Sequence, residues 1–201
     1  MLIKKEEARK IVKQNLNYLS FEQKKQISEN AWNTLLTGKD CPLKLNEYKA
    51  VLSYYALKAE VQTDFFNLCV LQKGIDLFLP KTIDKHNMEF YKVSSTDAYS
   101  SELVKNSWGI AEPKETFKKF CASDYKKSKI LVIVPGVAFK LDGQRLGHGN
   151  GYYDNYLSFL IEESKKYGIL PELKGVCFKC QTDIDFECSN TDVNVGDVLV
   201  F

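Results

Sequence analysis

The chain has 201 residues, which is enough for one domain with a sizeable core or for two small domains. Its 44% hydrophobic and 27% charged residues are typical of a soluble globular protein, and no apolar run is long enough to cross a bilayer. The net charge of +2 gives no indication of nucleic-acid binding or of attraction to an anionic membrane, and the charged N-terminal stretch lacks the apolar core of a secretory signal.

The first twenty residues predict an amphipathic helix. Apolar residues recur at helical spacing from Ala8 to Leu19. Lys5 and Arg9 are four residues apart, so they share one face near the start of this helix. On spacing alone, this pair is an ordinary solvated charged face.

A second helix is predicted directly afterwards. Ser20 and Gln23 have the spacing of a capping box, in which each side chain binds the backbone N–H of the other residue. Apolar residues from Phe21 to Leu36 would face inward, and Gly38 is the expected stop.

A strand and a helix come next. The stretch Lys49–Leu57 predicts a strand, and Thr63 or Asp64 can cap a helix that runs to Gly74. The short loop between them contains Glu60. Open α/β sheets bind ligands at the carboxyl ends of parallel strands, so Glu60 is placed for function. The alternative, which spacing alone favours, is an exposed loop acid without a role.

The remaining elements alternate in the same way. Further strands are predicted at 75–79, 88–91, 130–134, 175–180 and 198–200, and a further helix at 154–167. The strand at 130–134 is apolar throughout, as expected for a strand buried on both faces, and the strand at 88–91 is placed at an edge. This order predicts an α/β fold with a single doubly wound, largely parallel sheet and helices on both faces. No linker or repeat divides the chain, so one domain over residues 1–201 is expected.

Six cysteines are present, at positions 41, 69, 121, 177, 180 and 188. Cys177 and Cys180 form a C-x-x-C pair, which occurs in zinc and redox sites. The sequence offers no second pair or nearby histidine to complete a zinc site, and a strand over these residues would direct the two thiols to opposite faces. Free thiols in a reducing cytoplasm are therefore expected, with a metal or redox role as the minor alternative.

The most informative stretch joins the strand at 130–134 to the helix at 154–167. It carries four glycines, at positions 143, 147, 149 and 151. Glycine permits positive φ and close approach of the backbone to a ligand, and the N–H groups at the start of a helix bind anions. With the positive charge of Arg145 and the carboxylate of Asp154, a candidate Mg²⁺ ligand, this loop predicts a phosphate site. It has neither P-loop nor Rossmann spacing, and the alternative is a flexible surface turn.

Longer motifs resemble one protein family. The segments PGVAF and DGQRLGHGNGYYD are similar to the signature of the 5-formyltetrahydrofolate cyclo-ligases, or methenyltetrahydrofolate synthetases. The segments EVQT at 60–63 and WGIAEP at 108–113, and the N-terminal Lys and Arg, also resemble this family. The resemblance covers most of the chain. It implies ATP-dependent cyclisation of 5-formyltetrahydrofolate to 5,10-methenyltetrahydrofolate, with release of ADP and phosphate, through a phosphorylated formyl intermediate, an iminium phosphate.

The resemblance and the needs of phosphoryl transfer together imply residue roles. Lys5 and Arg145 would be catalytic, and Asp154 and Asp192 would bind Mg²⁺. ATP would contact Lys5, Arg9, Arg145, Leu146, Gly147, His148, Gly149, Asn150, Gly151, Tyr152 and Tyr153. The folate would contact Tyr55, Glu60, Trp108, Gly149 and Tyr152. A cytoplasmic monomer is expected, with these small molecules as its partners and neither nucleic acid nor membrane.

Several positions depart from the family pattern. Lys140 stands where Asp is usual after PGVAF, which bears on the geometry of the loop, and Asn155 replaces a frequent Arg. His148 occupies a variable position, as an exposed side chain or, alternatively, a catalytic one, and Thr191 replaces a common His. Two other functions stay open: a different ATP-using enzyme on the same scaffold, such as a small-molecule kinase, and a non-catalytic folate- or nucleotide-binding protein.

Overall fold

A six-stranded sheet organises the molecule. The computed structural model describes residues 2–37, 41–101, 103–106 and 110–201. The strand order is β10-β9-β6-β1-β2-β3. The bounds are β1 Ala50–Leu52, β2 Asp76–Thr82, β3 Met88–Val93, β6 Lys129–Pro135, β9 Leu170–Cys177 and β10 Asp197–Val200. All neighbours are parallel except β2 and β3, so the predicted edge strand is antiparallel. The prediction of a largely parallel sheet is confirmed.

The direction in which the chain crosses this sheet reverses between two central strands. From β1 the chain moves to its neighbour β2, whereas from β6 it moves to β9, on the other side. The loops that follow β1 and β6 therefore diverge from adjacent strand ends. Such a switch point leaves a crevice beyond the carboxyl ends of the strands, where open α/β sheets bind ligands.

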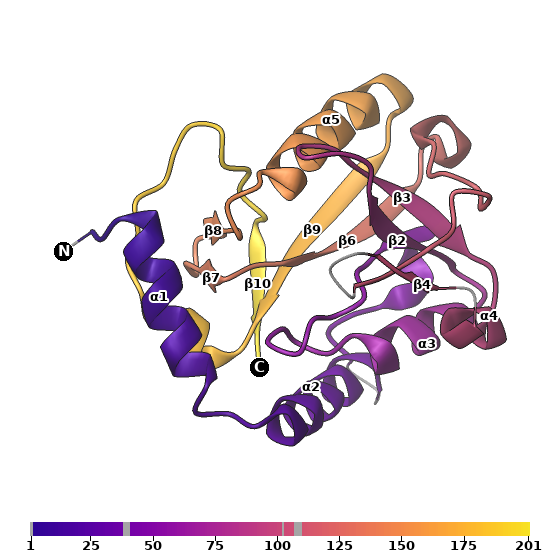
Figure 1. Ribbon diagram of the computed structural model, residues 1–201. Coiled ribbons are helices and arrows are strands. Elements are labelled where there is room, and N and C mark those ends of the chain that lie inside the picture. The colour runs from indigo at the N-terminus through magenta and orange to yellow at the C-terminus, as the bar shows by residue number, and fades with distance from the viewer. Residues whose placement is uncertain (1, 38–40, 102, 107–109) are drawn as a thin grey trace.

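Helices cover both faces of the sheet, as the sequence predicts. Their bounds are α1 Lys5–Leu16, α2 Phe21–Leu36, α3 Asp64–Gln72, α4 Thr96–Ser101 and α5 Tyr152–Tyr167. One face carries α5 and the other carries α1, α2 and α3 (Figure 1). Strand β6 divides the core accordingly: Ile130, Val132 and Val134 pack with α5, whereas Leu131 and Ile133 pack with α1, α2 and α3. From Ile130 to Pro135, every residue of this strand is thus buried.

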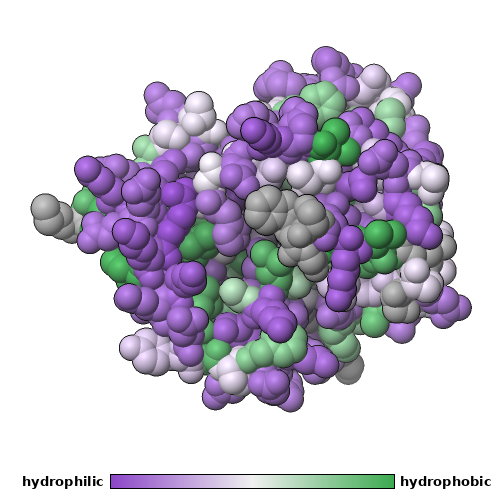
Figure 2. Space-filling model, in the orientation of Figure 1, coloured by the Kyte–Doolittle hydropathy of each residue, from purple (hydrophilic) through white to green (hydrophobic). Residues whose placement is uncertain are grey.

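Short elements complete the described chain. Two small hairpins pair β4 Val104–Lys105 with β5 Ala111–Glu112, and β7 Ala138–Phe139 with β8 Arg145–Leu146. Single 3₁₀ turns lie at η1 Leu45–Glu47, η2 Ala122–Tyr125 and η3 Lys179–Gln181. The face drawn in Figure 2 is mainly hydrophilic, with apolar residues in small scattered groups. In the described part of the chain, no helix has both the length and the apolar character needed to cross a membrane.

The predicted helix ends agree with the structure where they are described. Ser20 and Gln23 form the expected capping box. Gly168 adopts a left-handed conformation and ends α5. Helix α5 begins at Tyr152, two residues earlier than the pattern suggests, with Gly151 as its N-cap. Gly38, the predicted stop of the second helix, lies outside the described residues.

The prediction of a strand over Lys49–Leu57 is wrong beyond Leu52, where β1 ends. The backbone oxygen of Tyr54 accepts hydrogen bonds from the Thr63 hydroxyl at 2.6 Å and from the Asn67 amide at 3.0 Å. Side chains of the following segment thus take the place of a strand partner. The Thr63 hydroxyl is used in this way and does not cap α3.

The predicted strand at 175–180 is also too long. Strand β9 ends at Cys177, and the backbone N–H of Phe178 donates to the side-chain oxygen of Gln181 at 2.8 Å, which closes the η3 turn. The alternation argument for Cys177 and Cys180 therefore fails, because Cys180 is not in a strand. Both are free thiols, and burial raises the pKa of Cys177 to about 12. A protonated, buried thiol is inert.

Candidate functional site

A cavity of about 540 Å³ opens at the switch point of the sheet. Four segments that are distant in sequence meet there: the start of α1, the loop after β1, the glycine loop, and the loop before β10. The predicted site residues that line it are Lys5, Arg9, Tyr55, Glu60, Arg145, Leu146, Gly147, His148, Gly149, Asn150, Gly151, Tyr152, Tyr153, Asp154 and Asp192. Trp108 lies outside the described residues.

The glycine loop has a backbone that other residues would strain. Gly149 has φ 113° and Gly151 has φ 74°, in the left-handed region that side chains disfavour. A Cβ added at Gly147 would lie 2.9 Å from the Nη1 atom of Arg145. The loop therefore leaves room where side chains would otherwise stand. It leads into the first turn of α5, whose N-terminal residues line the cavity and can bind an anion.

Arg145 is the most buried charge of the site, with 3% of its side chain exposed. Its Nη2 atom lies 2.9 Å from Oδ2 of Asp154, and its Nη1 atom donates to the backbone oxygen of Pro135 at 3.4 Å. The guanidinium carbon is 5.5 Å from the ring centre of Tyr153. The Nε–H has no hydrogen-bond partner among the described residues. A buried donor left unpaired costs about 1–3 kcal/mol, and a ligand oxygen would remove that cost.

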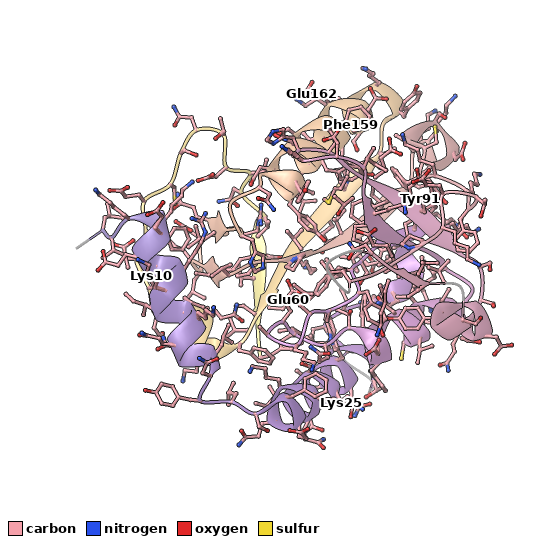
Figure 3. All side chains as sticks on the ribbon, viewed as in Figure 1. Lys10, Lys25, Glu60, Tyr91, Phe159 and Glu162 are labelled. Carbon is pink, nitrogen blue, oxygen red and sulfur yellow. The ribbon has the colours of Figure 1, made fainter. Side chains whose placement is uncertain are left out.

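Helix α1 reaches the cavity through its first two turns. Lys5 Nζ lies 2.6 Å from Oδ2 and 2.8 Å from Oδ1 of Asp192. Arg9 Nε donates to the backbone oxygen of Gly147 at 2.9 Å, so the helix holds the glycine loop directly. Lys10, labelled in Figure 3, belongs to the same helix but is exposed and does not line the cavity.

Asp192 is held by its own loop as well as by Lys5. The backbone N–H of Ser189 donates to Oδ2 of Asp192 at 2.8 Å. Burial acts to raise the pKa of this carboxyl group, but the bonds from Lys5 and Ser189 outweigh burial and hold the pKa below its usual value. The next residue, Val193, donates its backbone N–H to Oδ1 of Asp154 at 3.2 Å. The structure thus brings the loop of Asp192 against the carboxylate of Asp154.

Glu60 is fixed at the other side of the cavity (Figure 3). Its Oε2 accepts from the backbone N–H of Leu57 at 2.8 Å, and its Oε1 lies 3.6 Å from Nε2 of His148. Only 12% of the side chain is exposed, so the alternative of an exposed loop acid is wrong. Tyr55 packs its ring against that of Tyr99, with 6.0 Å between the ring centres.

Sequence reasoning missed one wall of the cavity. This wall comes from β2, β3 and β5, and includes Thr82, Met88 and Glu112. Glu112 is buried, and its Oε1 accepts from the backbone N–H of Thr82 at 3.1 Å and from the Asn106 amide at 2.9 Å. The W-G-I-x-E-P motif contains this glutamate, but no residue pattern in the motif predicts that the segment packs against β2.

Lys140, the departure expected to affect the loop, leaves its hairpin closed. The Lys140 N–H donates to the backbone oxygen of Gln144 at 2.8 Å, and the Gly143 N–H donates to that of Lys140 at 3.0 Å. The ammonium group lies 2.9 Å from Oδ1 of Asp185 and 5.2 Å from the ring centre of Phe186. The lysine therefore points to the segment that carries Asp192, and the β7–β8 hairpin is intact.

These features define a doubly wound α/β protein whose switch point carries a glycine-lined cavity with both cationic and carboxylate side chains. The model of the 5-formyltetrahydrofolate cyclo-ligase family matches residues 2–201. The chain belongs to this family of ligases.

Individual relatives agree with the assignment. The chain is 38% identical over 128 residues to a probable 5-formyltetrahydrofolate cyclo-ligase of Schizosaccharomyces pombe, a match that spans 62% of this chain and 59% of that protein. It is 28% identical to a probable 5-formyltetrahydrofolate cyclo-ligase of Caenorhabditis elegans, over 97% of this chain and 91% of that protein. The solution structure of Aquifex aeolicus 5,10-methenyltetrahydrofolate synthetase is similar with a TM-score of 0.71 and 30% identity, over 98% of this chain and 89% of that one.

Proposed function

We propose that this protein catalyses the ATP-dependent cyclisation of 5-formyltetrahydrofolate to 5,10-methenyltetrahydrofolate. One observation carries the proposal beyond family membership: the cations of α1, the glycine loop and the loop of Glu60 line a single cavity. A phosphate donor and a second ligand can therefore meet in it. The volume of about 540 Å³ lies within the range of small-molecule sites.

The chemistry explains why such a cavity suffices. The oxygen of an N-formyl group is a poor leaving group until it is phosphorylated. Transfer of the γ-phosphoryl group of ATP to this oxygen releases ADP and gives an iminium phosphate. The neighbouring folate nitrogen then attacks the formyl carbon and gives up its proton to the phosphate or to water, the carbon–oxygen bond breaks, and phosphate leaves. The protein has to orient the reactants and stabilise charge, and neither a covalent nucleophile nor a general base is required.

The proposed phosphate site uses the groups that the fold gathers around the glycine loop. Lys5, Arg9 and Arg145 would balance the charge of the transferring oxygens. The unpaired Nε–H of Arg145 supports this role, since it is a buried donor without an acceptor among the described residues. The N–H groups at the start of α5 would add a further anion site.

Asp154 and Asp192 would hold Mg²⁺ beside these phosphates. The donor set suits this ion, which binds one or two carboxylates together with phosphate oxygens and water. In the described part of the chain, no cluster of three His, Cys, Asp or Glu side chains forms a complete protein cage. When bound, Mg²⁺ would neutralise charge on the phosphates during transfer.

The folate is assigned to the side of the cavity that carries Tyr55 and Glu60, with Trp108 as a further contact. Gly149 and Tyr152 are assigned to both substrates, because the formyl group and the γ-phosphate have to meet. In the described residues, Glu60 is fixed by Leu57 and oriented towards His148. A carboxylate held in this way can accept hydrogen bonds from a pterin with little further loss of side-chain conformational entropy.

The decisive experiment mixes protein, ATP, Mg²⁺ and 5-formyltetrahydrofolate and follows absorbance of the methenyl chromophore. We expect absorbance to rise only when all three small molecules are present. Lys5→Ala should slow the reaction at least tenfold. Lys10→Ala removes the same charge from the exposed side of the same helix and should leave the rate unchanged.

The two alternatives give different results in this assay. A small-molecule kinase would consume ATP with another acceptor and form no methenyl product. A binding protein would take up ligand and leave ATP intact. Consumption of ATP without a rise in absorbance would therefore count against cyclo-ligase activity. The same holds if ATP is not consumed and absorbance does not rise. The cytoplasmic location and the monomeric state stay predictions; one related 5-formyltetrahydrofolate cyclo-ligase, of Arabidopsis thaliana, is named as mitochondrial.

A further inference from the structure

Two ion pairs in the cavity join the proposed phosphate cations to the proposed metal ligands. Lys5 Nζ is 2.6 Å from Oδ2 of Asp192. Arg145 Nη2 is 2.9 Å from Oδ2 of Asp154. The less exposed partner of each pair has at most 18% of its side chain exposed, so water screens these charges only in part. In each pair, a cation proposed to bind phosphate is thus occupied by a carboxylate proposed to bind the metal, whereas the third cation, Arg9, is bonded to the backbone oxygen of Gly147.

This arrangement treats the two components differently from their complex. Metal-free ATP can reach Arg9 and the Nε–H of Arg145 as they stand, but to engage Lys5 and Nη2 of Arg145 it would have to draw them away from the aspartates and would leave two carboxylates beside its own negative charge. Like charges at such distances repel, and a partly buried charge without a partner is costly. Mg²⁺ alone would meet carboxylates that are already neutralised. MgATP supplies an anion for each cation and a cation for the carboxylates, so every charge changes partner and none is left alone.

The backbone prepares the carboxylates for this exchange. Asp192 keeps a hydrogen bond from the Ser189 N–H, at 2.8 Å, when Lys5 leaves it. Asp154 keeps one from the Val193 N–H, at 3.2 Å, when Arg145 turns to a phosphate. Both carboxylates therefore stay in place while only the cations move.

We propose that the Lys5–Asp192 and Arg145–Asp154 pairs exclude metal-free nucleotide, so that Mg²⁺ and ATP bind together by exchanging partners with the two pairs. This inference rests on the proposed function. It adds a selectivity to the site, because the aspartates would disfavour binding of metal-free ATP as well as bind the metal. Reciprocity then requires that ATP strengthen Mg²⁺ binding by the same factor by which Mg²⁺ strengthens ATP binding.

The test measures the affinity for ATP by calorimetry, once with excess Mg²⁺ and once with a chelator. The wild-type protein should bind MgATP at least tenfold more tightly than metal-free ATP. Asp192→Asn should bind metal-free ATP at least fivefold more tightly than the wild type does, and MgATP more weakly. Weaker binding of both forms by one factor would overturn the inference and leave the proposed function standing. If the wild type bound neither form, the proposed function would fail as well.

Glu60→Gln is the matched control for a general repulsion of anions. It removes one negative charge from the same cavity, yet Glu60 contacts neither Lys5 nor Arg145 and is paired with His148 and the Leu57 N–H. The ratio of the two ATP affinities should stay within twofold of the wild-type ratio. A change as large as that of Asp192→Asn would show that only cavity charge matters, and the partner exchange would be wrong. Asp154→Asn repeats the test at the second pair should Asp192→Asn fail to fold.

A double-mutant cycle isolates the Lys5–Asp192 pair. In the wild-type background, Lys5→Ala should lower the affinity for metal-free ATP less than threefold, because Asp192 already occupies the lysine. In the Asp192→Asn background, Lys5→Ala should lower the affinity for metal-free ATP at least tenfold. Equal losses in the two backgrounds would contradict the exchange.

Discussion

At the scale of single residues, backbone conformation decides where glycine is required. Gly149 has φ 113°, and a Cβ there would meet its nearest neighbour, the Arg9 guanidinium, at 3.6 Å. Space is therefore available, and the obstacle is the dihedral angle. A site that needs close contact with phosphate uses this freedom of the backbone.

Gly149→Ala should lower the affinity for MgATP at least tenfold and destabilise the fold by about 1–2 kcal/mol, because alanine is strained at this φ. The matched control is Gly74→Ala, since Gly74 has φ +71° with no atom within 4 Å of an added Cβ and does not line the cavity. It should lose similar stability and keep its affinity. Calorimetry and thermal unfolding measure both quantities, and an unchanged affinity in Gly149→Ala would remove the loop from the phosphate site.

Asp76 gives a prediction of pH dependence away from the site. Burial acts to raise the pKa of its carboxyl group, but Lys92 and the Tyr125 hydroxyl, each 2.6 Å away, outweigh burial and hold the pKa below the ordinary 3.8. A lowered pKa in the folded state stabilises the protein above the unfolded value, and this contribution disappears as pH falls through the folded value. Asp76→Asn should therefore lose about 1 kcal/mol at pH 7 and less at a second pH below 3.8, where the carboxyl group begins to protonate in the folded state. Urea unfolding at the two pH values measures the difference, and an equal loss at both would refute the assignment.

At the scale of elements, local signals were readable from the sequence and non-local ones were not. The capping box of Ser20 and Gln23 involves neighbours in the chain, and the structure confirms it. The end of β1 depends on Thr63 and Asn67, whose side chains bind the Tyr54 oxygen from the next helix and the residue that precedes it. No periodicity within a strand reveals such a partner. The wall formed by Glu112 was missed for the same reason.

Thr63→Val tests whether these side-chain bonds position the loop of Tyr55 and Glu60. Valine keeps the shape but removes a buried hydroxyl that donates at 2.6 Å, so a loss of about 1–2 kcal/mol is expected. The KM for 5-formyltetrahydrofolate should rise more than the KM for ATP. Thr34→Val, at an exposed site on α2, is the control and should change stability by no more than about 0.5 kcal/mol. Equal effects on both KM values would show that the loop does not serve the folate side.

At the scale of the whole molecule, the sequence predicted the largely parallel sheet and most of the segments that line the cavity, because the alternation of strands and helices and the long motif are both local patterns. It did not predict that Lys5 pairs with Asp192 or Arg145 with Asp154. Those contacts depend on how α1, the β7–β8 hairpin and the last loop are packed, and only the assembled fold defines them. The shared-metal prediction for the two aspartates stays a prediction.

MgATP should stabilise the entire fold, since its proposed contacts join α1 to the glycine loop. Ligand at a hundred times its dissociation constant adds about 2.7 kcal/mol, which corresponds to a rise in Tm of roughly 5–10 °C for a chain of this size. Thermal unfolding with and without MgATP measures it. Lys10→Ala should show the full shift and Lys5→Ala a smaller one. No shift at millimolar MgATP in the wild type would argue against nucleotide binding.

The long reach of α1 has a consequence for synthesis. Lys5 and Asp192 are 187 residues apart, and α1 also rests on η3 and on β7. A ribosome that adds about 5–20 residues per second needs about 10–40 s to proceed from Lys5 to Asp192. Throughout that time, the apolar face of the first helix, with Ala8 and Val12, lacks the late segments that cover it. Helix α1 is thus translated long before the segments that hold it in place, and the proposed nucleotide site cannot form on a nascent chain that has not yet reached Asp192.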